Sequence, residues 1–270
     1  MTIADRARAF AALHAGPKLL ILPNAWDAGS ARIIESAGAK AIATSSAAVA
    51  WAHGYADGQF VPFETVLATV SEIVKTVSVP VSADIEAAYA DDAATAARTV
   101  GQVIDAGAVG INIEDGNDPP DLLAKKIENL RSAASKAGVD LWVNARVDTH
   151  LRRLVPAEKA YDETVRRSKL YREAGASSIF APAFPDNDRI AQLVKDVVLP
   201  LNLLAWPGLP DGAVLEKAGV RRLSAGSGIG KAVLNHTLAL AKAFLADGRS
   251  EPLTQGPLTN PHVNEMMRRG

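Results

Sequence analysis

Three short segments of the sequence carry closely spaced carboxylates. They are Ser82-Ala83-Asp84-Ile85-Glu86, Asn112-Ile113-Glu114-Asp115 and Gly54-Tyr55-Ala56-Asp57-Gly58. Carboxylates that converge repel one another unless a cation or a proton lies between them. Because these segments contain no His or Cys, they favour a hard divalent ion, Mg²⁺ or Mn²⁺, which keeps several of its waters. The alternative is that they are solvated loop acids or helix caps, the role expected of Asp92.

Other polar residues at comparable positions could bind an anionic substrate. Arg146 follows an apolar run, and its guanidinium could hold a carboxylate in a bidentate fork. An ion pair of Arg146 with Glu114 or Asp148 is an equal alternative. The segment Ser45-Ser46-Ala47 could present N–H groups and hydroxyls to an anion or simply pack. Asn202 could donate to a substrate carboxylate or bond only to backbone.

The elements that must position these side chains are short apolar runs alternating with longer amphipathic segments. Helices are expected in the amphipathic segments, and five of them end in Ala-Gly or a near equivalent, which suits a left-handed residue after a helix. The expected strands are eight: Leu19–Pro23, Ala39–Thr44, Val79–Asp84, Val109–Glu114, Asp140–Ala145, Ser177–Ala181, Leu199–Leu204 and Val220–Ala225.

Eight strands alternating with helices predict an α/β protein with a parallel, eight-stranded (β/α)₈ TIM barrel. A doubly wound sheet is the competitor, but the turn after the first strand, Pro23–Asp27, lacks the glycines typical of that fold. In a barrel, Asp84 and Glu114 would emerge from adjacent strands on the rim where ligands bind. The long segment Ser45–Phe60 would lie on that rim. We expect residues 1–246 to form the barrel and 247–270 a tail, frayed or docked on a neighbouring subunit, with one short helix at Val263–Arg269.

Composition narrows the possible functions. The chain has 270 residues, 48% of them hydrophobic, which is enough to bury a core. Its net charge of −1 gives no reason to expect nucleic acid or an anionic membrane as partner. The absence of cysteine excludes disulfides and a cysteine nucleophile or general acid. No segment looks like a signal peptide or membrane span, so a cytoplasmic protein is expected.

Several motifs, taken in order, resemble the isocitrate lyase/phosphoenolpyruvate mutase superfamily. They are Leu22–Asp27, Thr44-Ser45-Ser46, Ser82–Glu86, Gly110–Asp115 and Asn144–Asp148. The resemblance covers most of residues 18–230. It implies a (β/α)₈ barrel whose last helix is often exchanged between subunits of a homodimer or homotetramer.

The resemblance also implies how the site residues divide their work. Asp84 would lie closest to Mg²⁺, with Mn²⁺ as an alternative, and Asp57, Glu86 and Glu114 would hold its waters. The substrate would be a 2-oxo acid or related carboxylate. The residues expected to contact it are Thr44, Ser45, Ser46, Ala47, Arg146 and Asn202, and those expected to take part in catalysis are Asp57, Glu114 and Arg146.

Departures from the superfamily pattern shape the expected activity. Isocitrate and methylisocitrate lyases carry a Cys-containing loop after the fourth strand, but here that segment is the short Gly116–Asp121. The longer gating loop of phosphonopyruvate enzymes is also missing, and Thr44 replaces a frequent aromatic. The leading hypothesis is therefore a Mg²⁺-dependent lyase that breaks a C–C bond of a small 2-oxo acid, as in oxaloacetate decarboxylation. The alternatives are phosphonopyruvate hydrolysis or mutase chemistry, cleavage of a 2-hydroxy acid, and a non-catalytic 2-oxo-acid binder.

Overall fold

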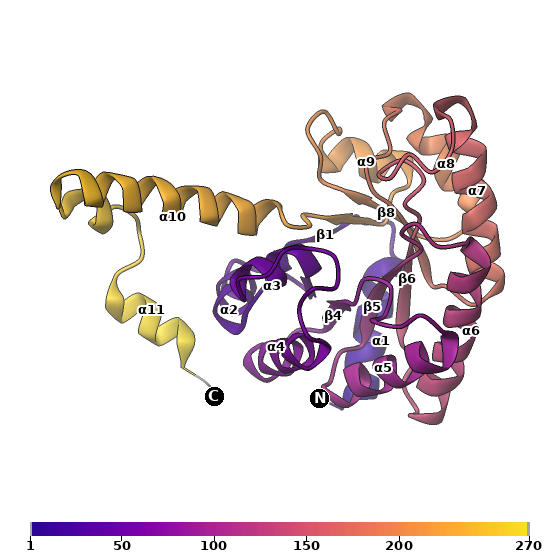
Figure 1. Ribbon diagram of the computed structural model, residues 1–270, viewed down its shortest axis with the longest axis horizontal. Coiled ribbons are helices and arrows are strands. Elements are labelled where there is room, and N and C mark those ends of the chain that lie inside the picture. Colours follow the sequence, from indigo (N-terminus) through magenta and orange to yellow (C-terminus); the bar gives the residue numbers. More distant parts are fainter. Residues whose placement is uncertain (1, 269–270) are drawn as a thin grey trace.

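A ring of parallel strands occupies the centre of the molecule (Figure 1). The computed structural model describes residues 2–268, and within them the sheet has nine strands in the order β1-β9-β8-β7-β6-β5-β4-β3-β2. The strands are β1 Leu20–Leu22, β2 Asn24–Ala25, β3 Ile42–Thr44, β4 Val81–Asp84, β5 Gly110–Glu114, β6 Trp142–Arg146, β7 Ser178–Ala181, β8 Leu201–Leu204 and β9 Arg222–Ser224. All neighbouring strands pair in parallel.

The ring is joined through a single stretch of chain, residues 20–25. Its first half, β1, pairs with β9, and its second half, β2, pairs with β3. Pro23 lies between the halves, and it has no N–H to give to a ladder. The two short strands therefore fill one position of an eight-position barrel. The predicted (β/α)₈ fold is confirmed, and each of the eight expected runs contains a strand.

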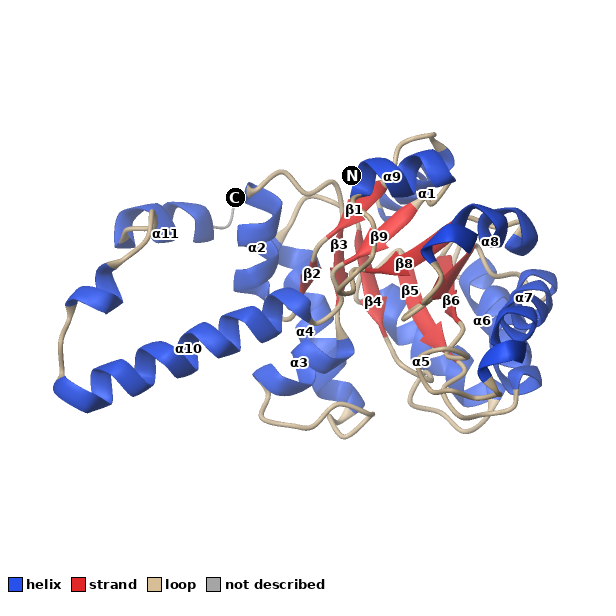
Figure 2. Ribbon diagram, turned by 90° about the horizontal axis from the view of Figure 1, so that it is seen from above, coloured by secondary structure: helices blue, strands red, loops and turns tan. Residues whose placement is uncertain are grey.

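The chain also forms helices, most of which surround the ring, while the last two extend away from it (Figure 2). They are α1 Ile3–Ala15, α2 Ala28–Ser36, α3 Ser46–Ala52, α4 Phe63–Thr76, α5 Ala93–Asp105, α6 Pro120–Lys136, α7 Ala157–Glu173, α8 Ile190–Val197, α9 Gly212–Ala218, α10 Gly228–Asp247 and α11 Asn260–Met267, with 3-10 turns at Asn187–Arg189 and Glu251–Thr254. All five glycines expected to follow helices have φ between +69° and +105°. Helix α3 was not expected, because its Ala- and Ser-rich sequence reads as a loop.

Helix α1 closes the amino-terminal end of the barrel. Phe10 lies so close to β5 that a Cβ added at Gly110 would come 2.6 Å from its ring. His14, from the same helix, stacks on Trp142 of β6 with ring centroids 4.1 Å apart. This end is filled with side chains, so a ligand must enter from the opposite, carboxyl-terminal end.

The carboxyl-terminal part of the chain leaves the barrel. Helix α10 projects outward as a long arm, and the chain then returns through α11 (Figure 1). Helix α11 contacts α2, where Arg32 Nη2 donates to the Arg268 carbonyl at 2.8 Å. The expected helix at Val263–Arg269 corresponds to α11, although α11 begins three residues earlier and Arg269 lies outside the described residues. Within those residues, none of the helices is long and apolar enough to cross a membrane.

Candidate functional site

A cavity of about 210 Å³ opens at the carboxyl ends of the strands. Its polar side includes six of the residues singled out from the sequence: Ser45, Ser46, Ala47, Asp57, Asp84 and Arg146. The apolar part of the lining comes from Leu151, Phe180, Pro182, Leu204 and Trp206. The structure thus brings together residues more than 150 positions apart in the sequence.

Asp84 is held by the junction of β3 and α3. The Ser46 backbone N–H donates to Asp84 Oδ2 at 2.9 Å, and the Asp84 backbone N–H donates to Thr44 Oγ1 at 2.8 Å. Among the described residues, the other carboxylate oxygen, Oδ1, has no hydrogen-bond or ion-pair partner. Asp84 is therefore fixed by one oxygen, while the second remains available. Thr44 itself is buried and lies outside the cavity lining, so it positions Asp84.

Glu86 joins the segment after β4 to the loop that carries Asp57. Its Oε1 accepts from the Gln59 backbone N–H at 3.0 Å and from the Tyr89 hydroxyl at 3.2 Å. A spacing of two residues would put Asp84 and Glu86 on one face of a strand, but β4 ends at Asp84 and Glu86 has a φ of 51°. Glu86 therefore reaches this position through a left-handed turn and not through strand alternation.

The acidic groups around Asp84 are electrostatically strained. Burial, followed by the nearby Asp84 carboxylate, raises the pKa of Glu86 to about 7. The same two causes raise the pKa of Asp57, although Arg146 opposes that shift. In the described part of the chain, Asp57, Asp84 and Glu86 form no ion pair with Lys, Arg or His. This side of the cavity lacks positive charge.

Arg146 lies within a network of largely buried charges. Its Nη1 is 2.6 Å from Glu114 Oε2, and its Nε and Nη2 donate to the two Asp148 oxygens at 2.6 and 3.0 Å. Burial alone would lower the pKa of Arg146, but Glu114 and Asp148 raise it above its usual value. Arg152 also pairs with Glu114 at 3.2 Å and with Asp148 at 3.0 Å.

Both ion-pair partners considered for Arg146 from the sequence are thus present. A guanidinium has five N–H groups, so these contacts leave donors available to the cavity that Arg146 lines. Glu114 is almost fully buried, does not line the cavity and forms ion pairs with Arg146 and Arg152. Burial raises the pKa of Glu114, with Arg146 opposing the shift.

The neighbouring acid, Asp115, has a structural role. Its Oδ2 accepts from Arg167 at 2.8 Å and from the Tyr171 hydroxyl at 2.6 Å, both on α7. Its Oδ1 accepts from the Asp148 backbone N–H at 2.9 Å. Asp115 therefore points away from the cavity and fixes the segment that carries Asp148.

The floor of the cavity is a polar network inside the barrel. Asn112 and Ser224 line the floor, and Arg222, completely buried, donates to both of them at 3.3 and 3.0 Å. Ser224 in turn donates to Asn202 Oδ1 at 3.1 Å. Asn202 is fully buried and lies beneath the floor, so its contact with the cavity runs through Ser224.

Several lining residues were not expected as site residues. Asn24 receives a hydrogen bond from the Gly226 backbone N–H at 2.8 Å, which attaches the glycine-rich turn after β9 to the rim. Ser224 ends β9 and Gly226 follows it, so both could have been found by that position alone, whereas Asn112 lies in the middle of β5. Leu151 and Phe180 carry no such signal, because apolar residues near strand ends usually belong to the core.

The loop between β5 and α6 is short, as the sequence indicated. It comprises residues 115–119 and closes a turn in which the Asp118 N–H donates to the Asp115 carbonyl at 2.8 Å. The cavity has no cover from this strand. Neither His53 nor His150 lines this cavity: His53 bonds to Thr69 at 2.9 Å, and His150 lines a different cavity.

No group of three His, Cys, Asp or Glu side chains within residues 2–268 converges tightly enough to ligate a metal ion together. The four acids proposed from the sequence therefore do not form a set of direct ligands. Asp84 and Asp57 line the cavity, whereas Glu86 and Glu114 stand behind it.

Comparisons with known proteins agree with this geometry. Residues 10–245 match the family model described as phosphoenolpyruvate phosphomutase. An uncharacterized protein of Mycobacterium tuberculosis is 34% identical over 244 residues, covering 89% of this chain and 90% of that protein. The oxaloacetate decarboxylase of Pseudomonas savastanoi pv. phaseolicola is 27% identical, covering 80% of this chain and 77% of that enzyme.

Solved structures give the same result. A Burkholderia cenocepacia protein described provisionally as a lyase/mutase has a TM-score of 0.89 at 32% identity, covering 97% of this chain and 95% of that one. The crystal structure of 2,3-dimethylmalate lyase has a TM-score of 0.83 at 25% identity, covering 99% and 95%. The fold together with these similarities identifies a (β/α)₈-barrel enzyme of the carbon–carbon lyase and mutase type. The chain belongs to the phosphoenolpyruvate mutase family, within the isocitrate lyase/phosphoenolpyruvate mutase superfamily.

Proposed function

We propose that this enzyme is a Mg²⁺-dependent lyase that breaks a C–C bond of a small 2-oxo acid, with decarboxylation of oxaloacetate as the simplest case. The observation that supports this most directly is the free Oδ1 of Asp84 in a cavity that Arg146 also lines. A 2-oxo diacid needs both features, since one end can chelate a cation while the other meets a guanidinium. The similarity to an oxaloacetate decarboxylase supports the same reaction.

The residues present suit a hydrated cation. Mg²⁺ usually binds through one or two carboxylates and keeps several waters, so a tight cluster of three protein ligands is not required. Asp84 would hold the ion directly, and Asp57, Glu86 and Glu114 would hold its waters. The raised pKa values of Asp57 and Glu86 show that these acids ionise against an unfavourable potential, which a cation would relieve. An all-oxygen donor set also accepts Mn²⁺.

The chain's own residues would bind and orient the substrate. The substrate carboxylate would lie near Ser45, Ser46 and Ala47. In the first turn of α3 the Ser46 N–H donates to Asp84 and the Ala48 N–H to Ser45 Oγ, so the Ala47 N–H is the one left for it. Arg146 would hold the far carboxylate with its remaining donors. Thr44 positions Asp84, and Asn202 positions Ser224 on the floor.

In decarboxylation, the bond between C3 and its carboxylate breaks, CO₂ leaves, and the electron pair remains as an enolate. The chemistry that Mg²⁺ supplies at such a site is Lewis-acid stabilisation of that negative charge. Solvent can then return a proton to C3, because the short 115–119 segment leaves the cavity open. Asp57 lines the cavity and would touch the substrate, whereas Glu114 positions Arg146.

Cleavage of a 2-hydroxy acid is the second candidate. The apolar part of the lining favours it, because Leu151, Phe180 and Trp206 offer nothing polar to oxaloacetate. The similarity to 2,3-dimethylmalate lyase supports this reading. A product assay distinguishes these two lyase activities from phosphonopyruvate chemistry and from a non-catalytic binder.

Self-association through α10 is part of the proposal. The helix leaves the barrel with Val233, Leu234, Leu238 and Leu245 exposed, and Leu245 is 85% exposed. Apolar surface of this kind marks an interaction site. We propose that a second copy of the chain covers it in a homodimer or homotetramer. Light scattering of the wild type and of Leu238→Asp tests this, since the variant should dissociate.

The deciding experiment is a product assay over oxaloacetate, 2-hydroxy diacids and phosphonopyruvate, each with Mg²⁺ and with chelator. We expect Mg²⁺-dependent pyruvate from oxaloacetate above the rate of the metal alone. Glyoxylate or pyruvate from a 2-hydroxy diacid would favour the second candidate. Thermal protection by oxalate with no product from any compound would show a binder and contradict the lyase.

A further inference from the structure

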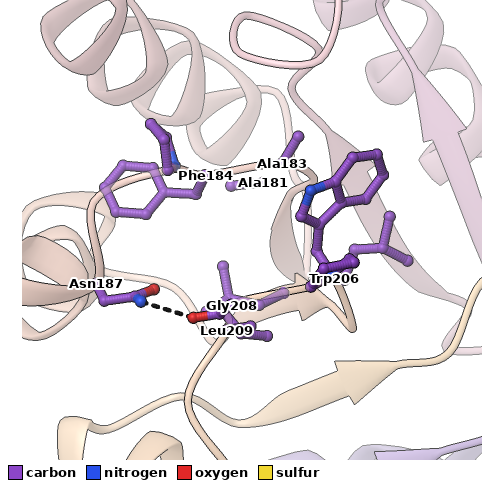
Figure 3. Close-up of a pocket in the computed structure, with 11 residues that line it drawn as sticks. Ala181, Ala183, Phe184, Asn187, Trp206, Gly208 and Leu209 are labelled. Atoms are coloured by element: carbon purple, nitrogen blue, oxygen red, sulfur yellow. Dashed lines mark hydrogen bonds between the residues drawn. The ribbon is translucent and has the colours of Figure 1, made fainter.

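A second cavity lies directly beside the candidate site, between the segments that follow β7 and β8 (Figure 3). Its volume is about 290 Å³. Apolar side chains of Phe184, Leu203, Trp206 and Leu209 surround it. In Figure 3, Phe184 and Trp206 stand on opposite sides, with Leu209 near the base. At about 30 Å³ per water molecule, the space corresponds to roughly ten waters.

Two side chains belong to both cavities. Leu204 and Trp206 line the candidate site and also the second cavity. On the β7 side the chain alternates, since Phe180 and Pro182 face the candidate site whereas Ala181 and Ala183 face the second cavity. The two spaces therefore share a boundary, and Trp206 is its largest member.

The walls of the second cavity are held in place by backbone geometry. Trp206, Pro207, Gly208 and Leu209 form a tight turn in which the Leu209 N–H donates to the Trp206 carbonyl at 3.0 Å. Gly208 has a φ of 89°, which this turn requires after a proline. Asn187 Nδ2 donates to the Gly208 carbonyl at 2.8 Å and ties the turn to the segment after β7.

The opposite wall is fixed by aromatic contacts. The Phe184 ring meets His150 edge to face at 5.2 Å and lies 6.2 Å from the Tyr161 ring. Phe184 is 7% exposed, so it cannot readily turn into the space beside it. A cavity with both walls fixed stays open, and the apolar side chains that line it can contact an apolar ligand group.

Trp206 offers exposed apolar surface at the boundary between the two cavities. It is 54% exposed, although it sits between two concave spaces. A tryptophan side chain can bury roughly 150 to 250 Å² of surface, so an apolar group that covers Trp206 removes a large area from water. Nothing in the proposed reaction of oxaloacetate uses this surface.

We propose that the substrate is a 2-oxo or 2-hydroxy acid with an alkyl or phenyl substituent, which passes Trp206 into the cavity formed with Phe184 and Leu209. Trp206 then determines specificity by contacting both the acid end and the apolar end. This inference rests on the proposed function, because the carboxylate end must occupy the Asp84 and Arg146 side first.

Binding of a graded ligand series tests the proposal. Pyruvate, 2-oxobutanoate, 2-oxopentanoate, 2-oxohexanoate and phenylpyruvate share one acid end and differ only in the apolar group. Their dissociation constants, measured by calorimetry with Mg²⁺, should tighten about fourfold per added methylene up to the size of the cavity. Equal affinity along the series would overturn the inference.

Leu209→Trp would fill the second cavity without touching the acid end. We expect this variant to bind pyruvate with the wild-type affinity and to lose the increase in affinity with ligand chain length. Val214→Trp, on the exposed side of α9, is the matched control and should keep the increase in affinity with chain length. A gain that persists in Leu209→Trp would place the apolar group elsewhere and contradict the proposal.

Failure of the proposed function and failure of this inference give different binding results. If neither oxalate nor pyruvate binds with Mg²⁺, the proposed function fails and this inference fails with it. If both bind but the series is flat, only the inference fails. The wild-type series alone gives this distinction, so the test does not depend on the folding of a variant.

Discussion

The Ser46 backbone N–H donates to Asp84 Oδ2 at 2.9 Å, which joins the start of α3 to the end of β4. One carboxylate oxygen is thereby occupied, and the other is left to the cavity. The two residues are 38 positions apart, and the parallel pairing of β3 with β4 brings them together. This contact directs Asp84 toward the position where a cation would bind.

Asp84→Ala is expected to abolish Mg²⁺-dependent binding of oxalate, because it removes the carboxylate that would touch the ion. The measurement is calorimetric titration of oxalate with Mg²⁺ and with chelator. Asp91→Ala, an exposed acid in the loop after β4, should bind oxalate normally. Undiminished Mg²⁺-dependent binding by Asp84→Ala would refute the assignment of the metal site.

Arg146→Ala is expected to weaken carboxylate binding while Mg²⁺ binding is retained. The variant also leaves Asp148, which is fully buried, without its bidentate partner, so unfolding should require about 3 to 5 kcal/mol less. Chemical denaturation and oxalate titration measure the two effects. Arg153→Ala, an exposed neighbour, should change neither, and an unchanged oxalate dissociation constant in Arg146→Ala would count against its role.

Mg²⁺ binding is expected to tighten as pH rises from 6 to 8. Burial and Asp84 raise the pKa of Glu86 to about 7, so its proton competes with the cation over this range. Because the pKa of Glu86 is higher in the folded than in the unfolded chain, the free energy of unfolding falls as pH rises from 4.5 toward 7, and a bound cation should restore that free energy. The apparent affinity should change by about tenfold, and by less in Glu86→Gln. Equal affinity at pH 6 and pH 8 would contradict the prediction.

Acid destabilisation should begin near pH 6.5 because of His14. Burial, followed by the charge of Arg222, lowers the pKa of His14 to about 3. Below pH 6.5 the His14 side chain is therefore protonated in the unfolded chain but stays neutral in the folded chain. The contribution of neutral His14 to the free energy of unfolding is fully present above pH 6.5 and decreases as pH falls toward 3, by about 2 kcal/mol between pH 7 and pH 5. Denaturation of His14→Leu should lack this slope, and the exposed His236→Gln should retain it. The same slope in His14→Leu would assign the effect to another group.

The sequence predicted the barrel because its signals are local. Apolar runs, amphipathic segments and Ala-Gly helix ends each depend on neighbouring residues, and all eight strand positions follow from them. The placement of Asp84 and Glu114 on adjacent strands follows as well, since parallel strands end at the same rim. Helix α3 escaped prediction because its seven residues contain no clear period.

Only the tertiary structure decided which of these side chains meet. Glu114 turns to Arg146 and Arg152, Asn202 lies beneath the floor, and Trp206 stands between two cavities. These outcomes depend on contacts between distant residues, such as Arg222 and Asn112, 110 positions apart, and on turns such as the left-handed residue Glu86. The sequence by itself determines the order of the elements and the residue types at their ends. Side-chain direction is settled by packing between elements, because each buried charge must find its partner across the barrel.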